Sequence, residues 1–391
     1  MSTNTLTRHS ILRAAALLAL LFLATAPTAN AREMRAAWVA TVFNIDFPSR
    51  QGLDAAAQQA EIIRILDTAA ALRLNALMVQ VRPEGDALYR SQLEPWSRFL
   101  TGTQGQDPGY DPLEFFIREG RRRGIAIHAW INPYRAAANS SHQRARSHPS
   151  NRFPSHTHRV RNMLWFDPGS AEVRAHTLLV VRDIITRYQV AGLHLDDYFY
   201  PYPVNAQRQE AFPDNATFRT YQRQGGKLSR EDWRRENVNT MVRQTAAVVR
   251  RHRPDAAFGV SPFGIYTRGQ PAEVQAGLDQ YHQIFADPVK WMNEGWVDYL
   301  APQLYWPDRG PQCFRTLLAW WRNPAVNRRG TPIIPGIAVD RLGGTHNWPA
   351  SEIATQLRLE RSIRPTGGFI LFSMKPVMQN KKGVHDHIRG R

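Results

Sequence analysis

The sequence predicts an α/β protein with a single (β/α)8 TIM barrel that is slightly irregular at its end. The first observation is an alternation. Short, nearly continuous apolar runs are separated by amphipathic helical patterns, as expected for parallel strands buried on both faces. The second is their number, because eight such runs favour a closed barrel over an open sheet. The third is that no glycine-rich phosphate-binding turn follows the first run, so nothing supports a dinucleotide-binding sheet.

The predicted strands cover residues 34–42, 75–81, 125–131, 192–196, 257–261, 297–304, 333–339 and 368–372. Between the first two, residues 56–72 carry Ile62, Ile65 and Leu66 at helical spacing. A second helix is predicted over residues 230–251, with Ser229 as its candidate N-cap. Ser351 is expected to play the same part for residues 352–363. The order of elements is therefore strand, helix, strand through most of the chain.

Two segments depart from a regular barrel. Residues 136–166 form the longest insertion, a loop after the third strand that is rich in His, Ser, Arg and Asn. After the eighth strand only residues 375–391 remain, which are too polar and glycine-marked for a full closing helix. We therefore assign the barrel to residues 32–375 and a basic C-terminal tail to residues 376–391.

The N-terminus predicts a signal peptide over residues 1–31. Arg8 and Arg13 make a positive start, residues 14–26 form a short apolar run, and Ala29-Asn30-Ala31 is a small-x-small cleavage site. The chain has one cysteine, Cys313, so no cysteine follows the cleavage site and the protein is not expected to be a lipoprotein. We expect an exported, periplasmic protein with no stable membrane insertion after cleavage.

Charge narrows the classes of partner. The whole chain carries +17, and removing the two leader arginines leaves +15. Such a charge can indicate nucleic-acid binding, but export argues against that class and no nucleic-acid module is present. Attraction to an anionic cell envelope fits better. Solvated helix faces, such as the one with Arg121, Arg122 and Arg123, account for the arginines equally well.

Polar residues follow the ends of most predicted strands, on the face where barrels build their sites. They are Arg82, Glu84 and Asp86 (strand two); His128, Trp130, Asn132, Tyr134 and Arg135 (strand three); His194, Asp196, Asp197 and Tyr198 (strand four); Ser261 (strand five); Gln303, Tyr305 and Trp306 (strand six); and Asp340 (strand seven). Carboxylates serve proton transfer and oxocarbenium-like charge, and aromatic faces pack on pyranose rings. This combination indicates a site for a polysaccharide.

Several long motifs strengthen this interpretation. GLHLDDYFYPYP, DWRRENVN, VSPFGIYTRG and PQLYW, together with AAWVATVFNIDFPS, QVRPEGDALY, AWINPYR and LWFDPGSAEVR, occur in order over residues 34–375. In these motifs the sequence resembles glycosyl-hydrolase-like family 10, which consists of exported bacterial barrel proteins. The resemblance implies a catalytic barrel that acts on bacterial glycans, with peptidoglycan strands as the favoured substrate. It brings no assigned catalytic pair.

Roles must therefore be argued from the residues. Strand alternation gives His194 and Asp196 the same parity, and a histidine facing the helix layer would be costly, so both are expected to face the barrel axis. Asp196 is then the candidate nucleophile or base. Glu84 is the candidate general acid, with Asp197 as its substitute, and Asp86 on the same strand and Asp340 on strand seven are the further candidates. Arg82 beside Glu84 favours the ionised carboxylate, which suits a base better than an acid.

Alternative roles for these carboxylates remain open. Glu84 could be a structural residue paired with an arginine, and the Asp196-Asp197 pair could be an N-cap or a loop ion pair. The motif GLHLDDYFYP also resembles the strand-four signature of family 18 chitinases. That signature places a glutamate where this chain has Tyr198 and an acid where it has His194. A literal chitinase mechanism is not expected, although assistance from the substrate's N-acetyl group stays open.

His128, His194, Asp196 and Asp197 are the residues that could bind a divalent metal ion. No His-x-His follows the first strand, where barrel metal hydrolases usually carry one, so we expect neither metal nor cofactor. The expected function is cleavage of glycosidic bonds in cell-wall glycan. The alternatives are a non-catalytic glycan-binding barrel, a metal-dependent polysaccharide deacetylase and a basic envelope scaffold. The oligomeric state is left open.

Overall fold

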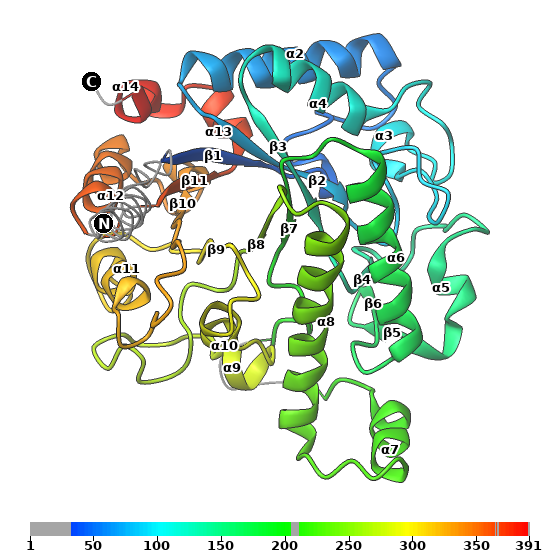
Figure 1. Cartoon of the computed structure of the whole chain (residues 1–391). Coiled ribbons are helices and arrows are strands. Elements are labelled where there is room, and N and C mark those ends of the chain that lie inside the picture. Colours follow the sequence, from blue (N-terminus) through cyan, green and yellow to red (C-terminus); the bar gives the residue numbers. More distant parts are fainter. Residues whose placement is uncertain (1–32, 205–210, 364, 366, 390–391) are drawn as a thin grey trace, which may run out of the picture. The chain divides into compact units, whose positions relative to one another are not determined.

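A computed structural model describes residues 33–204, 211–363, 365 and 367–389, so the predicted signal peptide lies outside the described residues. Within them the compact unit begins at Met34. Its main sheet has eight parallel strands in the order β10-β11-β1-β2-β3-β7-β8-β9 (Figure 1). These are β1 (Met34–Val39), β2 (Ala76–Arg82), β3 (Ala126–Ile131), β7 (Gly192–Leu195), β8 (Ala257–Val260), β9 (Tyr299–Leu300), β10 (Gly336–Ala338) and β11 (Gly368–Phe372). The eight predicted strands are these eight, in sequence order.

The two ends of the sheet meet and close the barrel. Isolated parallel bridges join Leu300 to Ile333 and Gln303 to Gly336. Two backbone bonds reinforce them: Ile334 N donates to Leu300 O at 2.9 Å, and Gly336 N donates to Pro302 O at 2.8 Å. Closure leaves no open edge between β9 and β10. The predicted (β/α)8 fold is confirmed.

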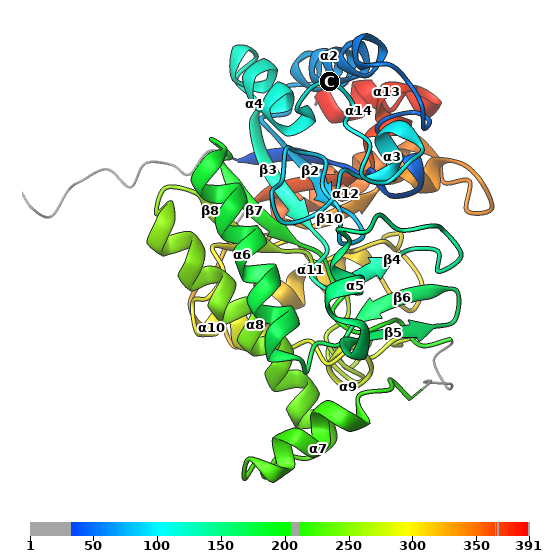
Figure 2. The same cartoon turned by 90° about the vertical axis from the view of Figure 1, so that its right-hand side faces the viewer.

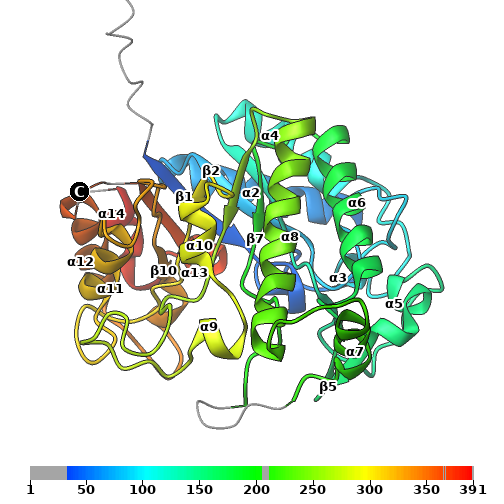
Figure 3. The same ribbon diagram turned by 60° about the horizontal axis from the view of Figure 1, so that its bottom comes forward.

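Helices surround the strands (Figure 3). They are α2 (Ala55–Ala71), α3 (Arg98–Thr101), α4 (Pro112–Arg122), α5 (Pro149–Arg152), α6 (Ala171–Arg187), α7 (Asn215–Arg223), α8 (Arg230–His252), α9 (Gln280–Gln283), α10 (Pro288–Asn293), α11 (Phe314–Arg322) and α12 (Ala350–Ser362). Ser229 caps α8 as predicted, accepting a bond from Asp232 N at 3.1 Å. Ser351 is no cap, because α12 starts at Ala350, two residues before the predicted start, with Pro349 at the N-cap position. None of the helices in the described part of the chain has the length and apolar character needed to cross a bilayer.

The insertion after the third strand is more ordered than its polar composition predicts. It contains a three-stranded antiparallel sheet of β4 (Arg135–Ala137), β6 (Met163–Phe166) and β5 (Thr157–Val160). Figure 2 shows these strands beside α5. Trp165 and Phe166 of β6 are fully buried and belong to the main hydrophobic core of the barrel. These two side chains anchor the insertion on the barrel, which is why it folds as a small sheet instead of an irregular loop.

The last described residues are not the tail that the sequence predicts. They form α13 (Met374–Met378) and α14 (Val384–Arg389), joined by a 3-10 turn at Lys381–Gly383. Val377, Val384 and Ile388 are completely buried. α14 packs on α12, and α13 packs on β1 and α2. These apolar side chains at helical spacing cover the gap that a full eighth helix would fill, so the barrel domain extends through Arg389.

The interior of the barrel is partly polar. His194 Nδ1 and His128 Nδ1 lie 3.0 and 3.3 Å from the Tyr299 hydroxyl, and Trp38 Nε1 donates to His194 Nε2 at 3.2 Å. Burial lowers the pKa of His194 to about 3 and that of His128 to about 4, so both rings are neutral. His194 therefore faces the axis, as strand alternation predicts. Gly192 makes room for this column, since a Cβ there would lie 2.3 Å from His128 Nδ1.

We expect Gly192→Ala to destabilise the barrel, because the added methyl group would press on His128 and, at 2.6 Å, on the Ala257 carbonyl oxygen. Overpacking of this kind costs about 2 kcal/mol or more of unfolding free energy. Gly277→Ala is the matched control, because nothing lies within 4 Å of its Cβ position. Denaturant unfolding measures both. Equal stability of the two variants would show that His128 can move aside at little cost.

Candidate active site

A cavity of about 320 Å³ opens at the carboxyl ends of the barrel strands. It is lined by nine of the residues predicted for the site, namely Trp130, Arg135, Asp196, Asp197, Tyr198, Ser261, Gln303, Tyr305 and Asp340. Seven further lining residues are Trp38, Ala40, Val42, Ile45, Gln80, Arg341 and Phe372. Every strand of the barrel thus contributes lining residues from its end or from the segment that follows it. We call this space the mouth cavity.

Asp196 is buried and held from several directions. Its Oδ2 accepts bonds from Trp130 Nε1, at 3.2 Å, and from Asn132 Nδ2. Its Oδ1 accepts the backbone N–H of Tyr198 at 3.3 Å. Burial raises the pKa of Asp196 to about 6, and the positive charge of Arg135 together with these bonds opposes a larger rise. Asp196 is therefore mostly ionised at neutral pH, in a fixed orientation.

Asp197 is equally buried but less satisfied. Its Oδ2 accepts a bond from the Tyr202 hydroxyl, whereas its Oδ1 has no hydrogen-bond partner among the described residues. Burial, and then the charge of neighbouring Asp196, raise the pKa of Asp197 to about 7. A carboxyl group with such a pKa holds a proton in a large share of molecules near neutral pH. The free oxygen belongs to a residue that lines the mouth cavity.

Aromatic rings line the same cavity. Trp38, Trp130, Tyr198, Tyr305 and Phe372 come from five different segments of the barrel. Tyr305 and Phe372 lie with ring centroids 5.5 Å apart, and Trp38 meets Phe372 edge-on at 6.1 Å. The Arg135 guanidinium lies 5.0 Å from the centre of the Tyr198 ring. Apolar ring faces beside buried carboxyls are what pyranose binding requires.

Other predicted residues lie outside the cavity lining. His128, Asn132 and His194 stand behind it: the histidines lie in the barrel column, and Asn132 holds Asp196. Tyr134 is fully buried. Trp306 packs against Phe263, with centroids 5.4 Å apart.

The three predicted residues of the second strand are also placed elsewhere. Arg82 forms a two-point ion pair with Glu94, at 2.8 and 2.6 Å, and both side chains are inaccessible to solvent. Glu84 binds Arg98 at 2.7 Å and accepts the backbone N–H of Ala138 at 2.6 Å. Asp86 accepts a bond from Gln104 at 3.1 Å. The arginine beside Glu84 in sequence is thus not its partner.

Glu84 as the general acid was the prediction that the geometry supports least. Its carboxylate is absent from the lining of the mouth cavity, and both of its oxygens already accept bonds. It instead ties α3 to the insertion after β3, because Arg98 belongs to α3 and Ala138 follows β4. The surroundings of Glu84 match the alternative role, that of a structural residue paired with an arginine.

A metal site is not assembled from the predicted ligands. Among the residues that the structure describes, no group of three or more His, Cys, Asp or Glu side chains is arranged to hold an ion. His128 and His194 bind the Tyr299 hydroxyl, and Asp196 binds Trp130 and Asn132.

Sequence reasoning missed Gln80 as a site residue, although it stands at the end of a predicted strand. Its Oε1 accepts the backbone N–H groups of Thr41 and Val42, each at 2.9 Å, and its Nε2 donates to Asn132 Oδ1 at 2.6 Å. Trp38 and Phe372, which lie at the ends of β1 and β11 and line the mouth cavity, were not predicted as site residues either. The same parity argument that placed His194 could have found all three.

Buried carboxyls and clustered aromatic rings at the carboxyl end of a closed barrel define a glycoside-hydrolase-like TIM barrel. Comparison with known proteins gives the family. Residues 33–350 match the family described as Glycosyl hydrolase-like 10, and the chain belongs to it. The resemblance found in the motifs is thereby confirmed.

Two curated relatives extend along nearly all of the chain. Glycosyl hydrolase YngK of Bacillus subtilis is 36% identical over 367 residues, which cover 91% of this chain and 71% of the relative. Glycosyl hydrolase DigH of Escherichia coli K12 is 32% identical over 372 residues, which cover 88% of this chain and 83% of the relative.

Solved structures support the fold. The glycoside hydrolase domain of PgaB (BpsB) from Bordetella bronchiseptica matches with a TM-score of 0.59 at 11% identity, over 92% of this chain and 99% of that one. The catalytic domain of the β-amylase from Paenibacillus polymyxa matches with a TM-score of 0.58 at 10% identity, over 91% and 96% of the two chains. At these identities the likeness concerns the barrel alone.

Glu84→Gln is expected to weaken the fold and leave turnover within a few-fold of wild type. The substitution removes a buried ion pair and leaves Arg98 uncompensated, which costs about 3 kcal/mol of unfolding free energy. Denaturant unfolding and kcat on glycan strands, measured below the unfolding temperature, test the two parts. A hundredfold loss of kcat in a folded variant would restore Glu84 as the acid.

Proposed function

We propose that this protein is an exported glycoside hydrolase that cleaves glycosidic bonds in bacterial cell-wall glycan, with peptidoglycan strands as substrate. Membership of the Glycosyl hydrolase-like 10 family supports the reaction class. The relatives that carry the name glycosyl hydrolase support it too. The cell-wall substrate and the periplasmic location follow from the motif resemblance and from the leader-like residues 1–31. The formal charge of +17 suits a protein that works against an anionic envelope.

The observation that carries the proposal concerns Asp197. This residue lines the mouth cavity, its carboxyl group is buried, and one carboxyl oxygen has no hydrogen-bond partner among the described residues. A general acid must keep its proton until substrate arrives and must present it to the glycosidic oxygen. Burial and the charge of Asp196 achieve the first by raising the pKa of Asp197 to about 7. The place of Asp197 in the lining of the mouth cavity supplies the second, and Oδ1, which is buried without a hydrogen-bond partner among the described residues, is the oxygen left to carry the proton. Asp197, the substitute in the sequence prediction, thus replaces Glu84 as the proposed acid.

Asp196 takes the complementary role. Its pKa of about 6 leaves it ionised when Asp197 is still partly protonated. As Asp197 gives its proton to the leaving oxygen and the bond from the anomeric carbon to that oxygen breaks, positive charge develops on the sugar ring. The Asp196 carboxylate, fixed by Trp130 and Asn132, stabilises that charge. Water completes hydrolysis by adding its hydroxyl to the anomeric carbon and giving its remaining proton to the Asp197 carboxylate, which restores the acid.

Asp197→Asn should lower kcat on purified glycan strands by about a hundredfold or more, because an amide cannot supply the proton. Asp86→Asn is the matched control. Asp86 is also fully buried with a pKa raised to about 7, but it does not line the mouth cavity. Mass spectrometry of strand lengths after incubation measures both. Equal losses in the two variants, or none in Asp197→Asn, would remove Asp197 from the mechanism.

The pH profile of kcat/KM should be a narrow bell with its maximum between about pH 6 and about pH 7. As pH falls through about 6, Asp196 gains a proton and no longer stabilises the sugar cation. As pH rises through about 7, Asp197 loses the proton that it must donate. The two limbs belong to the interacting pair. Initial rates on glycan strands across this range test the assignment, and a profile that stays flat above about pH 8 would contradict it.

A further inference from the structure

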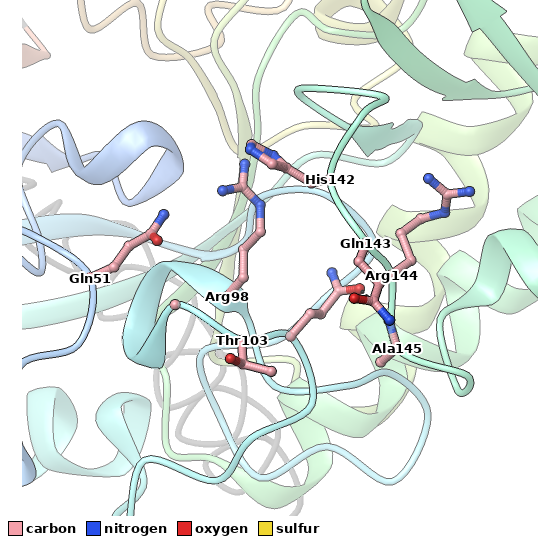
Figure 4. A pocket seen from close by; sticks show the side chains of 9 residues that line it. Gln51, Arg98, Thr103, His142, Gln143, Arg144 and Ala145 are labelled. Atoms are coloured by element: carbon pink, nitrogen blue, oxygen red, sulfur yellow. Dashed lines mark hydrogen bonds between the residues drawn. The ribbon is translucent and has the colours of Figure 1, made fainter.

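A second cavity of about 310 Å³ lies on the same loops as the mouth cavity and is lined by basic and amide side chains (Figure 4). Its lining consists of Gln51, Arg98, Gly102, Thr103, Gln104, His142, Gln143, Arg144 and Ala145. None of these residues is acidic. In the view of Figure 4, the Arg98 side chain stands between Gln51 and Gln143 with its guanidinium group towards His142. We call this space the arginine pocket.

Both arginines hold hydrogen-bond donors in reserve. Arg98 is only 7% exposed, and its Nε donates to Glu84 Oε1 at 2.7 Å. Its Nη2 is buried without a hydrogen-bond partner among the described residues, and so is Arg144 Nε. An unsatisfied buried guanidinium nitrogen costs free energy in the empty protein. Both arginines line the pocket, so an anion held there would compensate their positive charge, and the planar guanidinium matches a carboxylate.

The arginine pocket and the mouth cavity are built by the same three segments. After β1, Ala40, Val42 and Ile45 line the mouth cavity and Gln51 lines the arginine pocket. After β2 the two contributions are Gln80 and residues 98–104, and after β3 they are Arg135 and residues 142–145. Val42, Phe99 and Ala138 form a small apolar cluster of their own at this junction. The two cavities are thus built on the same three loop segments at the carboxyl end of the barrel.

Phe43 stands at the junction with an exposed ring. It is 58% exposed, more than any other large apolar side chain of the described residues, and its ring lies edge-on to Phe99 at 6.2 Å. Its backbone is left-handed, with φ of 55°, and the next residue, Asn44, has φ of 53°. The Asn44 side chain holds this turn by donating to Pro48 O and Phe99 O, each at 2.9 Å. A bulky residue in a costly conformation that exposes its ring indicates a function.

From these observations we propose that the arginine pocket is an outer subsite for a carboxylate-bearing sugar of the glycan, and that Phe43 stacks on the sugar between this subsite and the mouth cavity. The inference rests on the proposed glycan substrate and specifies its chemistry: the polymer carries carboxylates at intervals along its length. Arg144 and Arg98 supply charge-assisted hydrogen bonds to that group. Phe43 supplies an apolar face for a pyranose ring.

Binding measurements test the subsite independently of catalysis. Calorimetry with the Asp197→Asn protein compares two probes of equal length, namely peptide-free peptidoglycan strands and the same strands with their carboxylates methyl-esterified. Arg144→Ala in this background should weaken binding of the acidic strands about tenfold and leave binding of the esterified strands within about twofold. Phe43→Ala should weaken the binding of both probes. Arg146→Ala, an exposed arginine of the same loop outside the pocket, is the control and should change neither.

The outcomes separate the two proposals. If Arg144→Ala binds both probes as the parent does while wild type cleaves the strands, the subsite is refuted and the proposed function stands. If the parent binds acidic and esterified strands equally, the carboxylate is not recognised, which also refutes the subsite. If neither probe binds and wild type leaves strand lengths unchanged, both proposals fail. Arg146→Ala could also lose as much affinity for acidic strands as Arg144→Ala does. That result would show that the overall positive charge binds the strands, and it would refute the subsite.

Discussion

The position of Asp196 depends on one chain of hydrogen bonds that starts at the loop after the first strand. The backbone N–H groups of Thr41 and Val42 both bind Gln80 Oε1, which fixes the orientation of that amide. Gln80 Nε2 then donates to Asn132 Oδ1, so the Asn132 Nδ2 must point to Asp196. All four amide groups of this chain of hydrogen bonds are paired, so the loop after β1 determines how the Asp196 carboxylate is oriented.

The same requirement operates one layer deeper. Trp38 and Ser261, which line the mouth cavity, both contact His194 Nε2, at 3.2 and 3.0 Å. His194 Nε2 can accept the indole N–H of Trp38 only while the ring is neutral, and burial keeps it so. Its other nitrogen, Nδ1, is hydrogen-bonded to the Tyr299 hydroxyl, which is also hydrogen-bonded to His128 Nδ1. The wall of the cavity is thus supported by a polar column in the barrel, where an ordinary barrel core has branched apolar residues.

Much of this arrangement could be predicted from the sequence. Eight apolar runs gave the strands in order, and the parity of strand four placed His194 inside. The failures have a common cause. Arg82 pairs with Glu94, and Glu84 pairs with Arg98, twelve and fourteen residues away along a stretch with little regular structure. Strand periodicity says nothing about such a stretch, so the choice of partner, and with it the role of Glu84, depends on how the loop folds.

Asp196 and Asp197 both reach the mouth cavity because strand β7 ends directly before them. β7 ends at Leu195, one residue before the predicted end, so alternation no longer directs Asp197 to the helix layer and both acids line the cavity. Their charges then interact. Asp196 has Arg135 and three hydrogen bonds that favour its ionised form. The side chains of Tyr202 and Gln303 lower the pKa of Asp197, but it also experiences the charge of Asp196, which raises that pKa. Burial raises the pKa of both acids, and the surroundings of Asp196 hold its pKa at about 6, below the value of about 7 for Asp197.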